Sequence, residues 1–106
     1  MVLEIGAGVG SLSQRIAPKV GQLLSVEIDK RFFPLWKEVM GGYCNAILIE
    51  SDIRRVKSPQ KPYKVIANIP YYLTSPLLGT FLRRQTGLRP NVIVFLMQKD
   101  VALKIL

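Results

Sequence analysis

Short apolar runs alternate along this chain with longer segments in which apolar residues recur at helical spacing. Near-continuous apolar runs are typical of strands that are buried on both faces of a parallel sheet. We predict five such strands, at residues 2–5, 22–27, 46–49, 63–67 and 92–97. Amphipathic helical segments separate most of them, which indicates an α/β domain with a doubly wound, mainly parallel sheet.

Polar residues and a proline mark where the first helices should begin. Ser11 and Gln14 have the spacing of a capping box, so we predict a helix that begins at Ser11. Asp29 is a suitable cap for the next helix, because its carboxylate can accept from a free backbone N–H group. Pro34 predicts that regular helix there starts only around Phe33.

The chain has 106 residues, with 15 Lys and Arg against 7 Asp and Glu, and a formal net charge of +8. A chain of this length has room for one hydrophobic core, so we expect one domain over residues 1–106. The charge favours a polyanionic partner, nucleic acid first, with an anionic membrane surface or simple solubility as alternatives. Residues 54–61 are basic and predicted to form a surface loop. The predicted RNA contacts are Arg54, Arg55, Lys57, Lys61, Arg83 and Arg84, for which a solvated basic face is the alternative.

Several classes of protein are excluded by what the sequence lacks. No apolar run approaches the roughly 20 residues needed to cross a bilayer, and the N-terminus lacks the pattern of a secretory signal. The one cysteine is Cys44, and there is no histidine. An internal disulfide, most zinc sites and Ser-His or Cys-His catalysis are therefore excluded, and we expect neither a membrane nor a metal as partner.

The strongest local signal is the run Glu4-x-Gly6-x-Gly8-x-Gly10, between the first strand and the first helix. Glycines at such a turn let the backbone approach a ligand closely, and the N-terminus of a helix follows. A dinucleotide-binding fingerprint requires Gly-x-Gly-x-x-Gly, but Ser11 stands where its third glycine should be. The spacing thus disfavours a nicotinamide oxidoreductase, and a plain strand-to-helix turn remains the other interpretation.

Two acids follow neighbouring strands of the predicted sheet. Because ligands of open α/β sheets bind outside the carboxyl ends of the strands, we expect Glu4, the glycines, Glu27 and Asp52 to converge on one crevice. Glu27 can accept hydrogen bonds from both ribose hydroxyls of a nucleoside, a role for which Asp29 competes. Asp52 can accept from the exocyclic amine of an adenine while the amide of Ile53 donates to its ring. A solvated strand-end acid and an Asx turn are the alternatives.

Asn68-Ile69-Pro70-Tyr71 follows the fourth strand, at the same edge. Pro70 favours an extended Ile69, which would direct the Ile69 carbonyl and the Asn68 amide outward at a fixed separation. Two acceptors and an aromatic ring suit a planar base that bears an amine. A Pro-Tyr turn packed on the core is the alternative, although it does not explain the amide.

These residues resemble the ribosomal RNA adenine dimethyltransferase family, S-adenosylmethionine-dependent enzymes with the Rossmann-like class I methyltransferase fold. The resemblance covers nearly the whole chain, in the segments Val2 to Gly10, Val26-Glu27-Ile28-Asp29, Ser51-Asp52-Ile53, Asn68 to Pro76 and Met97 to Ala102. The first two segments are generic to the superfamily, whereas the Asn-Ile-Pro-Tyr and Gln-Lys-Asp-Val-Ala runs are specific. The Thr-Ser-Pro and Gln-Lys-Asp runs are more similar to the small-subunit enzymes than to the large-subunit resistance enzymes.

The resemblance implies methyl transfer from S-adenosyl-L-methionine to the exocyclic amine of adenosines in small-subunit ribosomal RNA, giving dimethyladenosine. It implies cofactor contacts from Gly6, Gly8, Glu27, Ile28, Asp52, Ile53 and Asn68, and a catalytic loop of Asn68, Ile69, Pro70 and Tyr71. It also implies a cytoplasmic protein, monomeric at full length, that acts on a small ribosomal subunit precursor. A non-catalytic RNA-binding factor for ribosome assembly is the alternative, which the intact Asn-Ile-Pro-Tyr run argues against.

The sequence departs from the family pattern in two mild ways and one larger one. Asp100 stands where Glu is usual, and Lys104 stands where Arg is usual. The family's N-terminal segment, last two strands, Phe-containing loop and C-terminal helical domain have no counterpart in residues 1–106. We therefore expect an incomplete S-adenosylmethionine-binding domain that is inactive in isolation.

Overall fold

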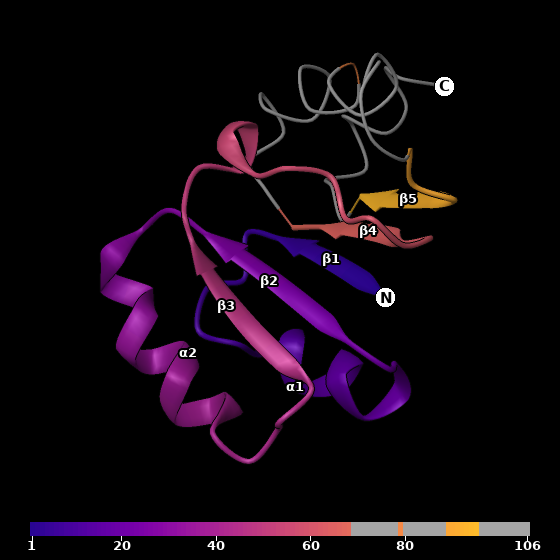
Figure 1. The fold of residues 1–106 in the computed structure, drawn as a ribbon. Coiled ribbons are helices and arrows are strands. Elements are labelled where there is room, and N and C mark those ends of the chain that lie inside the picture. The colour runs from indigo at the N-terminus through magenta and orange to yellow at the C-terminus, as the bar shows by residue number, and fades with distance from the viewer. Residues whose placement is uncertain (69–78, 80–88, 96–106) are drawn as a thin grey trace.

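The computed structural model describes residues 1–68, 79 and 89–95. Within them lies one sheet of five parallel strands, in the order β3-β2-β1-β4-β5 (Figure 1). The strands are β1 (Val2–Ile5), β2 (Leu23–Glu27), β3 (Ala46–Glu50), β4 (Lys64–Ala67) and β5 (Val92–Phe95). The predicted doubly wound parallel fold is confirmed, and the predicted strand ends lie within one residue of the observed ones. Residues 96 and 97 of the last predicted strand lie outside the described residues.

The strand order reverses direction beside β1. The chain lays down β1, β2 and β3 successively toward one side and then crosses to place β4 on the other side of β1. Such a reversal separates the loops that leave two neighbouring strands, and open α/β sheets bind ligands in the resulting crevice. The loops after β1 and β4 therefore flank the expected ligand position.

Short helical elements connect the strands. They are α1 (Ser13–Ile16), η1 (Ala17–Lys19), η2 (Lys30–Phe32), α2 (Phe33–Met40) and η3 (Ile53–Arg55). Asp29 caps η2 by accepting from the Arg31 backbone N–H at 3.0 Å, and α2 begins at Phe33, as predicted. Both α1 and α2 lie on the same side of the sheet (Figure 1).

The predicted start of the first helix at Ser11 is wrong. The helix begins at Ser13, and its N-cap residue, Leu12, makes no side-chain cap bond. A capping box at Ser11 would need the backbone N–H of Gln14, but that group donates to the carbonyl of Gly10 at 3.0 Å. The glycine turn therefore supplies the cap from its own backbone, and the Ser11 side chain stays exposed.

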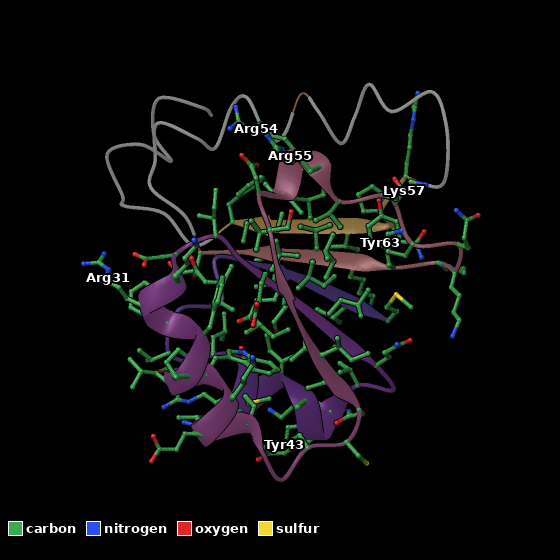
Figure 2. The ribbon with its side chains drawn as sticks, turned by 60° about the vertical axis from the view of Figure 1, so that its left-hand side comes forward. Arg31, Tyr43, Arg54, Arg55, Lys57 and Tyr63 are labelled. Atoms are coloured by element: carbon green, nitrogen blue, oxygen red, sulfur yellow. The ribbon has the colours of Figure 1, made fainter. Side chains whose placement is uncertain are left out.

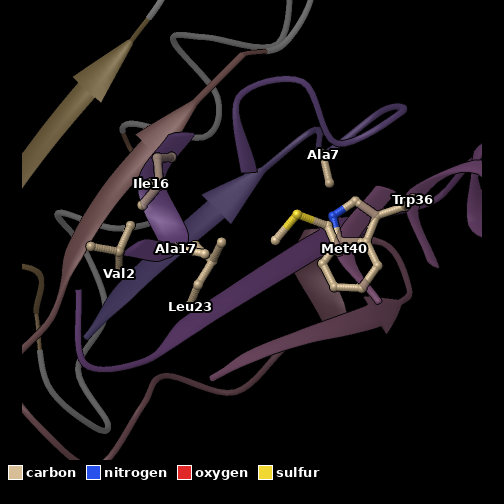
Figure 3. Packing of buried hydrophobic residues seen from close by; sticks show 7 residues of the cluster. All are labelled: Val2, Ala7, Ile16, Ala17, Leu23, Trp36 and Met40. Carbon is tan, nitrogen blue, oxygen red and sulfur yellow. The ribbon is translucent and has the colours of Figure 1, made fainter. Parts of the chain in front are cut away.

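Alternating side chains build one apolar cluster on each face of the sheet. The cluster beneath α1 and α2 consists of Val2, Ala7, Ile16, Ala17, Leu23, Trp36 and Met40 (Figure 3). The opposite cluster consists of Leu3, Ile5, Val26, Tyr63, Val65 and Ala67. Ile53 and Val56 pack against the second cluster, so η3 and the residues after it cover the face that α1 and α2 leave free.

Candidate functional site

The glycine loop joins β1 to α1 with a backbone that other residues rarely adopt. Gly6, Gly8 and Gly10 have φ angles of 81°, 56° and 91°. Residues with a Cβ pay about 1–2 kcal/mol in this left-handed region. The backbone N–H groups of Gly6 and Ala7 both donate to the carbonyl of Val26, at 2.9 and 3.2 Å, and hold the start of the loop against β2.

Glu27 lies at the end of β2, with its carboxylate under the glycine loop. Its Oε1 accepts from the Gly8 backbone N–H at 2.8 Å, and its Oε2 accepts from those of Ile28 and Asp29 at 3.0 and 2.9 Å. The residue is 8% exposed. A carboxylate has about four acceptor positions. Three are filled by backbone donors, so Glu27 is rigidly held and keeps one position for a further donor.

Space for a ligand lies beside Gly8. A Cβ built there would meet no atom within 4 Å in the described part of the chain, and the neighbouring Val9 and Ile28 are 40% and 62% exposed. The loop therefore presents open backbone, apolar surface and the buried Glu27 carboxylate together. These are the features that a nucleoside with a polar ribose and a flat base would contact.

Asp52 caps η3, one strand further out. Its Oδ1 accepts from the Arg54 backbone N–H at 2.9 Å, and the Arg54 guanidinium reaches both carboxylate oxygens, at 2.5 to 3.1 Å. Side-chain and backbone hydrogen bonds from Arg54 lower the pKa of Asp52 to about 2. The carboxylate is thus ionised at neutral pH. An adenine amine at this position would have to share it with Arg54, a pairing that the sequence did not predict.

Asn68 follows β4 at the strand end next to β1. Its backbone N–H donates to the carbonyl of Ile5 at 3.0 Å, and its side chain is exposed. Ile5 and Ala67 are register partners, so Asn68 and Gly6 continue from neighbouring strands at the same edge. Ile69, Pro70 and Tyr71 lie outside the described residues. The structure thus brings the glycine loop, Glu27 and Asn68 to one edge.

The expected place of Glu4 in the crevice is wrong. Glu4 is 1% exposed, and its Oε1 accepts from the hydroxyls of Ser13 and Ser25 beneath the loop. Side chains alternate along a strand, so Glu4 shares the inner face with its register partner Ser25. Burial raises the pKa of Glu4, against the lowering effect of the two hydroxyls. Sequence analysis missed this cluster because neither serine follows a recognisable motif.

Three of the predicted RNA contacts lie on the face opposite α1 and α2. Figure 2 shows Arg54, Arg55 and Lys57 on the side of the sheet away from α2. They and Lys61 are exposed. Arg54 is already paired with Asp52, which leaves Arg55, Lys57 and Lys61 as the more available cations of this stretch. Arg83 and Arg84 lie outside the described residues.

Among residues 1–68, 79 and 89–95, every helix is too short to cross a lipid bilayer. No group of three or more His, Cys, Asp or Glu side chains there could hold a metal ion.

Comparison with known proteins gives consistent matches over the whole chain. The family model for ribosomal RNA adenine dimethylase matches residues 1–106. Ribosomal RNA small subunit methyltransferase A of Alkaliphilus oremlandii is 38% identical over 109 residues, which cover 95% of this chain and 37% of that protein. The protein of the same name from Latilactobacillus sakei is 39% identical, over 98% of this chain and 37% of its own length. The chain thus spans little more than a third of these relatives.

A solved structure supports the same assignment. The dimethyladenosine transferase from Plasmodium falciparum superposes with a TM-score of 0.80 and 29% identity, over 98% of this chain and 38% of that one. Fold, edge residues and sequence similarity agree, and this chain belongs to the ribosomal RNA adenine dimethylase family.

Proposed function

We propose that this protein transfers methyl groups from S-adenosyl-L-methionine to the exocyclic amine of adenosines in small-subunit ribosomal RNA. Two transfers to one amine would give dimethyladenosine. The observation that carries the proposal is the meeting of the glycine loop, the buried Glu27 carboxylate and Asn68 at one edge of the sheet. Membership of the family and relatives named ribosomal RNA small subunit methyltransferase A support it.

The residues at this edge fit the cofactor. The free acceptor position of Glu27 suits a ribose hydroxyl, and the open backbone at Gly8 admits a ligand without a Cβ in the way. In this proposal Gly6 and Gly8 line the methionine end, and Asp52 and the Ile53 amide hold the adenine. Ile28 is 62% exposed beside Glu27 and offers its apolar side chain to the same nucleoside.

The bound cofactor supplies a methyl group on a positively charged sulfonium, whose leaving group departs neutral. The chain therefore has to position the reacting amine rather than remove a proton beforehand. The Asn68 side chain and the Ile69 carbonyl accept hydrogens of the amine and orient its lone pair. In this proposal Tyr71 provides the aromatic ring that stacks on the target base, and Pro70 limits the backbone freedom of the residue before it. Residues 1–106 contain no histidine, so none of them can contribute an imidazole to the reaction.

The partner in this proposal is the RNA of a small ribosomal subunit precursor. The exposed cations Arg55, Lys57 and Lys61 support a polyanionic partner. Bacterial ribosomes are assembled in the cytoplasm, so the proposal includes a cytoplasmic location. We also propose that the complete protein is a monomer.

Methyl transfer by the Asn68→Ala variant of the complete protein tests this function. Loss of one transition-state hydrogen bond in a preorganised site costs about 2.7–4 kcal/mol, so single-turnover methylation of precursor small-subunit RNA should slow roughly a hundredfold to a thousandfold. Asn91→Ala is the matched control, because Asn91 is exposed before β5, at the opposite end of the sheet. Methylation by Asn68→Ala at the parental rate would favour the non-catalytic assembly factor.

A further inference from the structure

Glu4 is the most deeply buried acid in the described part of the chain, and half of its carboxyl group has no partner. Its Oε1 accepts from the hydroxyls of Ser13 and Ser25, the latter at 2.7 Å. Its Oε2 is buried from solvent and has no hydrogen-bond partner among the described residues. The Ser13 hydroxyl in turn accepts from Trp36 Nε1 at 3.0 Å. A connected polar cluster thus lies within the apolar layer beneath the glycine loop.

This environment suits an uncharged acid better than a carboxylate. A buried carboxylate needs a cation or several donors distributed over both oxygens. In residues 1–68, 79 and 89–95, Glu4 forms no ion pair, and both of its donors are neutral hydroxyls on a single oxygen. A protonated Oε2 leaves one neutral O–H group without an acceptor, which costs less free energy than a buried carboxylate with one charged oxygen unpartnered.

The position of Glu4 links this cluster to the glycine loop. Glu4 precedes the loop and Ser13 follows it, so their hydrogen bond joins the two ends of the segment that contains all three positive-φ glycines. Trp36 supports the loop from below, since a Cβ at Gly10 would lie 3.4 Å from Trp36 Cδ1. A loop held at both ends and underneath loses less conformational entropy when a ligand binds.

We propose that Glu4 is a positioning residue for the cofactor loop and acts as a neutral carboxylic acid that ties β1 to α1 and, through Ser13, to Trp36. The inference rests on the proposed function, because it assigns the loop to cofactor binding. Glu4 itself does not touch the cofactor. Ionisation of Glu4 would place a second negative charge near Glu27 and loosen the loop from below.

Glu27 is the charged group that most affects Glu4 in the described part of the chain. Glu27 extends from the same face of β2 as Ser25, and its charge adds to the burial that raises the pKa of Glu4. The other charged groups on the packed elements are exposed: Arg15 on α1, Lys37 and Glu38 on α2, and Lys64 on β4. Lys37 is 2.8 Å from Glu50 and is thereby directed away. Rising pH should therefore weaken cofactor binding through Glu4.

Calorimetric titration of the complete protein with S-adenosylhomocysteine tests the proposal. Glu4→Gln keeps the shape of the neutral acid, so its affinity at neutral pH should stay within about twofold of the parental value. Glu4→Ala and Ser13→Ala each remove a member of the polar cluster and should weaken binding by about tenfold. Because burial raises the pKa of Glu4, the parental protein should lose affinity relative to Glu4→Gln as the pH rises, since Gln at this position cannot ionise. The matched controls are Glu38→Gln and Ser11→Ala, at exposed positions.

The outcomes separate this inference from the proposed function. A parental protein that does not bind S-adenosylhomocysteine overturns both. If the parental protein binds it but Glu4→Gln is as weak as Ser13→Ala, a carboxylate is required and the neutral-acid proposal is wrong. Identical pH profiles for the parental protein and Glu4→Gln would contradict it equally, and the cofactor assignment would stand.

Discussion

At the scale of single residues, Glu27 has both a structural and a proposed binding role. Its carboxylate already accepts three backbone hydrogen bonds, from Gly8, Ile28 and Asp29. Each donor belongs to a segment that faces the edge of the sheet. The acid therefore shapes the loop that we propose to contact the cofactor, besides offering its own remaining acceptor position.

We predict that Glu27→Ala weakens binding of S-adenosylhomocysteine by about 1–3 kcal/mol, the range for orphaned buried hydrogen-bonding groups. Isothermal titration of the complete protein measures this loss. Glu50→Ala is the matched control, because Glu50 is the register partner of Glu27 on β3 and pairs with Lys37 at the surface. Equal affinities for Glu27→Ala and Glu50→Ala would show that Glu27 does not contribute to cofactor binding.

Glu4 gives a prediction about stability that has the opposite sign to most substitutions of buried residues. Burial raises the pKa of Glu4 above its ordinary value of 4.5, so above that pH the native state keeps a proton that the unfolded chain releases. The contribution of Glu4 to stability is therefore complete below about pH 4.5 and declines as pH rises through the folded-state pKa. Gln cannot ionise and should avoid this decline.

At neutral pH we thus expect Glu4→Gln to be at least as stable as the parental protein, with an advantage that shrinks as the pH falls toward about 4.5. Urea denaturation at a series of pH values measures the difference. Glu38→Gln, at an exposed position on α2, should show no comparable trend. A Gln variant that is less stable at neutral pH than at acidic pH, relative to the parental protein, would show that Glu4 is ionised in the native state.

At the scale of elements, the glycine loop depends on backbone conformation more than on space. At Gly10, with a φ of 91°, an added Cβ would make ordinary contacts of 3.4 to 3.5 Å with Trp36, Val39 and Met40. We predict that Gly10→Ala destabilises the protein by about 1–2 kcal/mol, the cost of a left-handed residue with a Cβ. The urea midpoint measures the change.

Gly21→Ala is the matched control for this element. Gly21 is exposed, has no positive φ and would place its Cβ in open space. The substitution should be neutral or should stabilise the protein by about 0.4–1 kcal/mol, because Ala lowers the conformational entropy of the unfolded chain. Equal midpoints for the two variants would show that the loop tolerates a side chain at Gly10.

The sequence predicted the strands and the edge of the site well, because both depend on local patterns. Apolar runs located all five strands, and the parallel order places Gly6, Glu27 and Asn68 together. The sequence missed the Glu4 cluster with Ser13 and Ser25 because that cluster depends on contacts between distant residues. It also missed the cap from Gly10 to Gln14, which is a local contact of the backbone that no side-chain pattern marks. The Arg54 pairing with Asp52 was missed for another reason, because the two residues were assigned to different functions.

At the scale of the whole molecule, the two faces of the sheet have different polar features. The face of α1 and α2 contains the polar cluster that supports the glycine loop, whereas η3 and the following residues place cations on the other face (Figure 2). The carboxyl edge lies between them. The exposed cations thus lie on the face of the sheet away from the helices. That the isolated 106-residue chain is inactive stays a prediction.

The exposed cations Arg55 and Lys57, on the face opposite α1 and α2, lead to a prediction about how RNA binding depends on salt. Each phosphate contact contributes a slope of about −0.7 to −0.9 to the logarithm of affinity against the logarithm of salt concentration. We expect the double variant Arg55→Ala, Lys57→Ala to bind precursor small-subunit RNA less tightly at low salt and with a slope shallower by about 1.5. The double variant Arg15→Ala, Lys19→Ala removes the same charges from the opposite face and should keep the parental slope. Fluorescence anisotropy over a salt series measures both slopes. If only net charge matters, the two double variants should change the slope equally. If the RNA contacts η3 and the residues after it, only the Arg55→Ala, Lys57→Ala variant should change it.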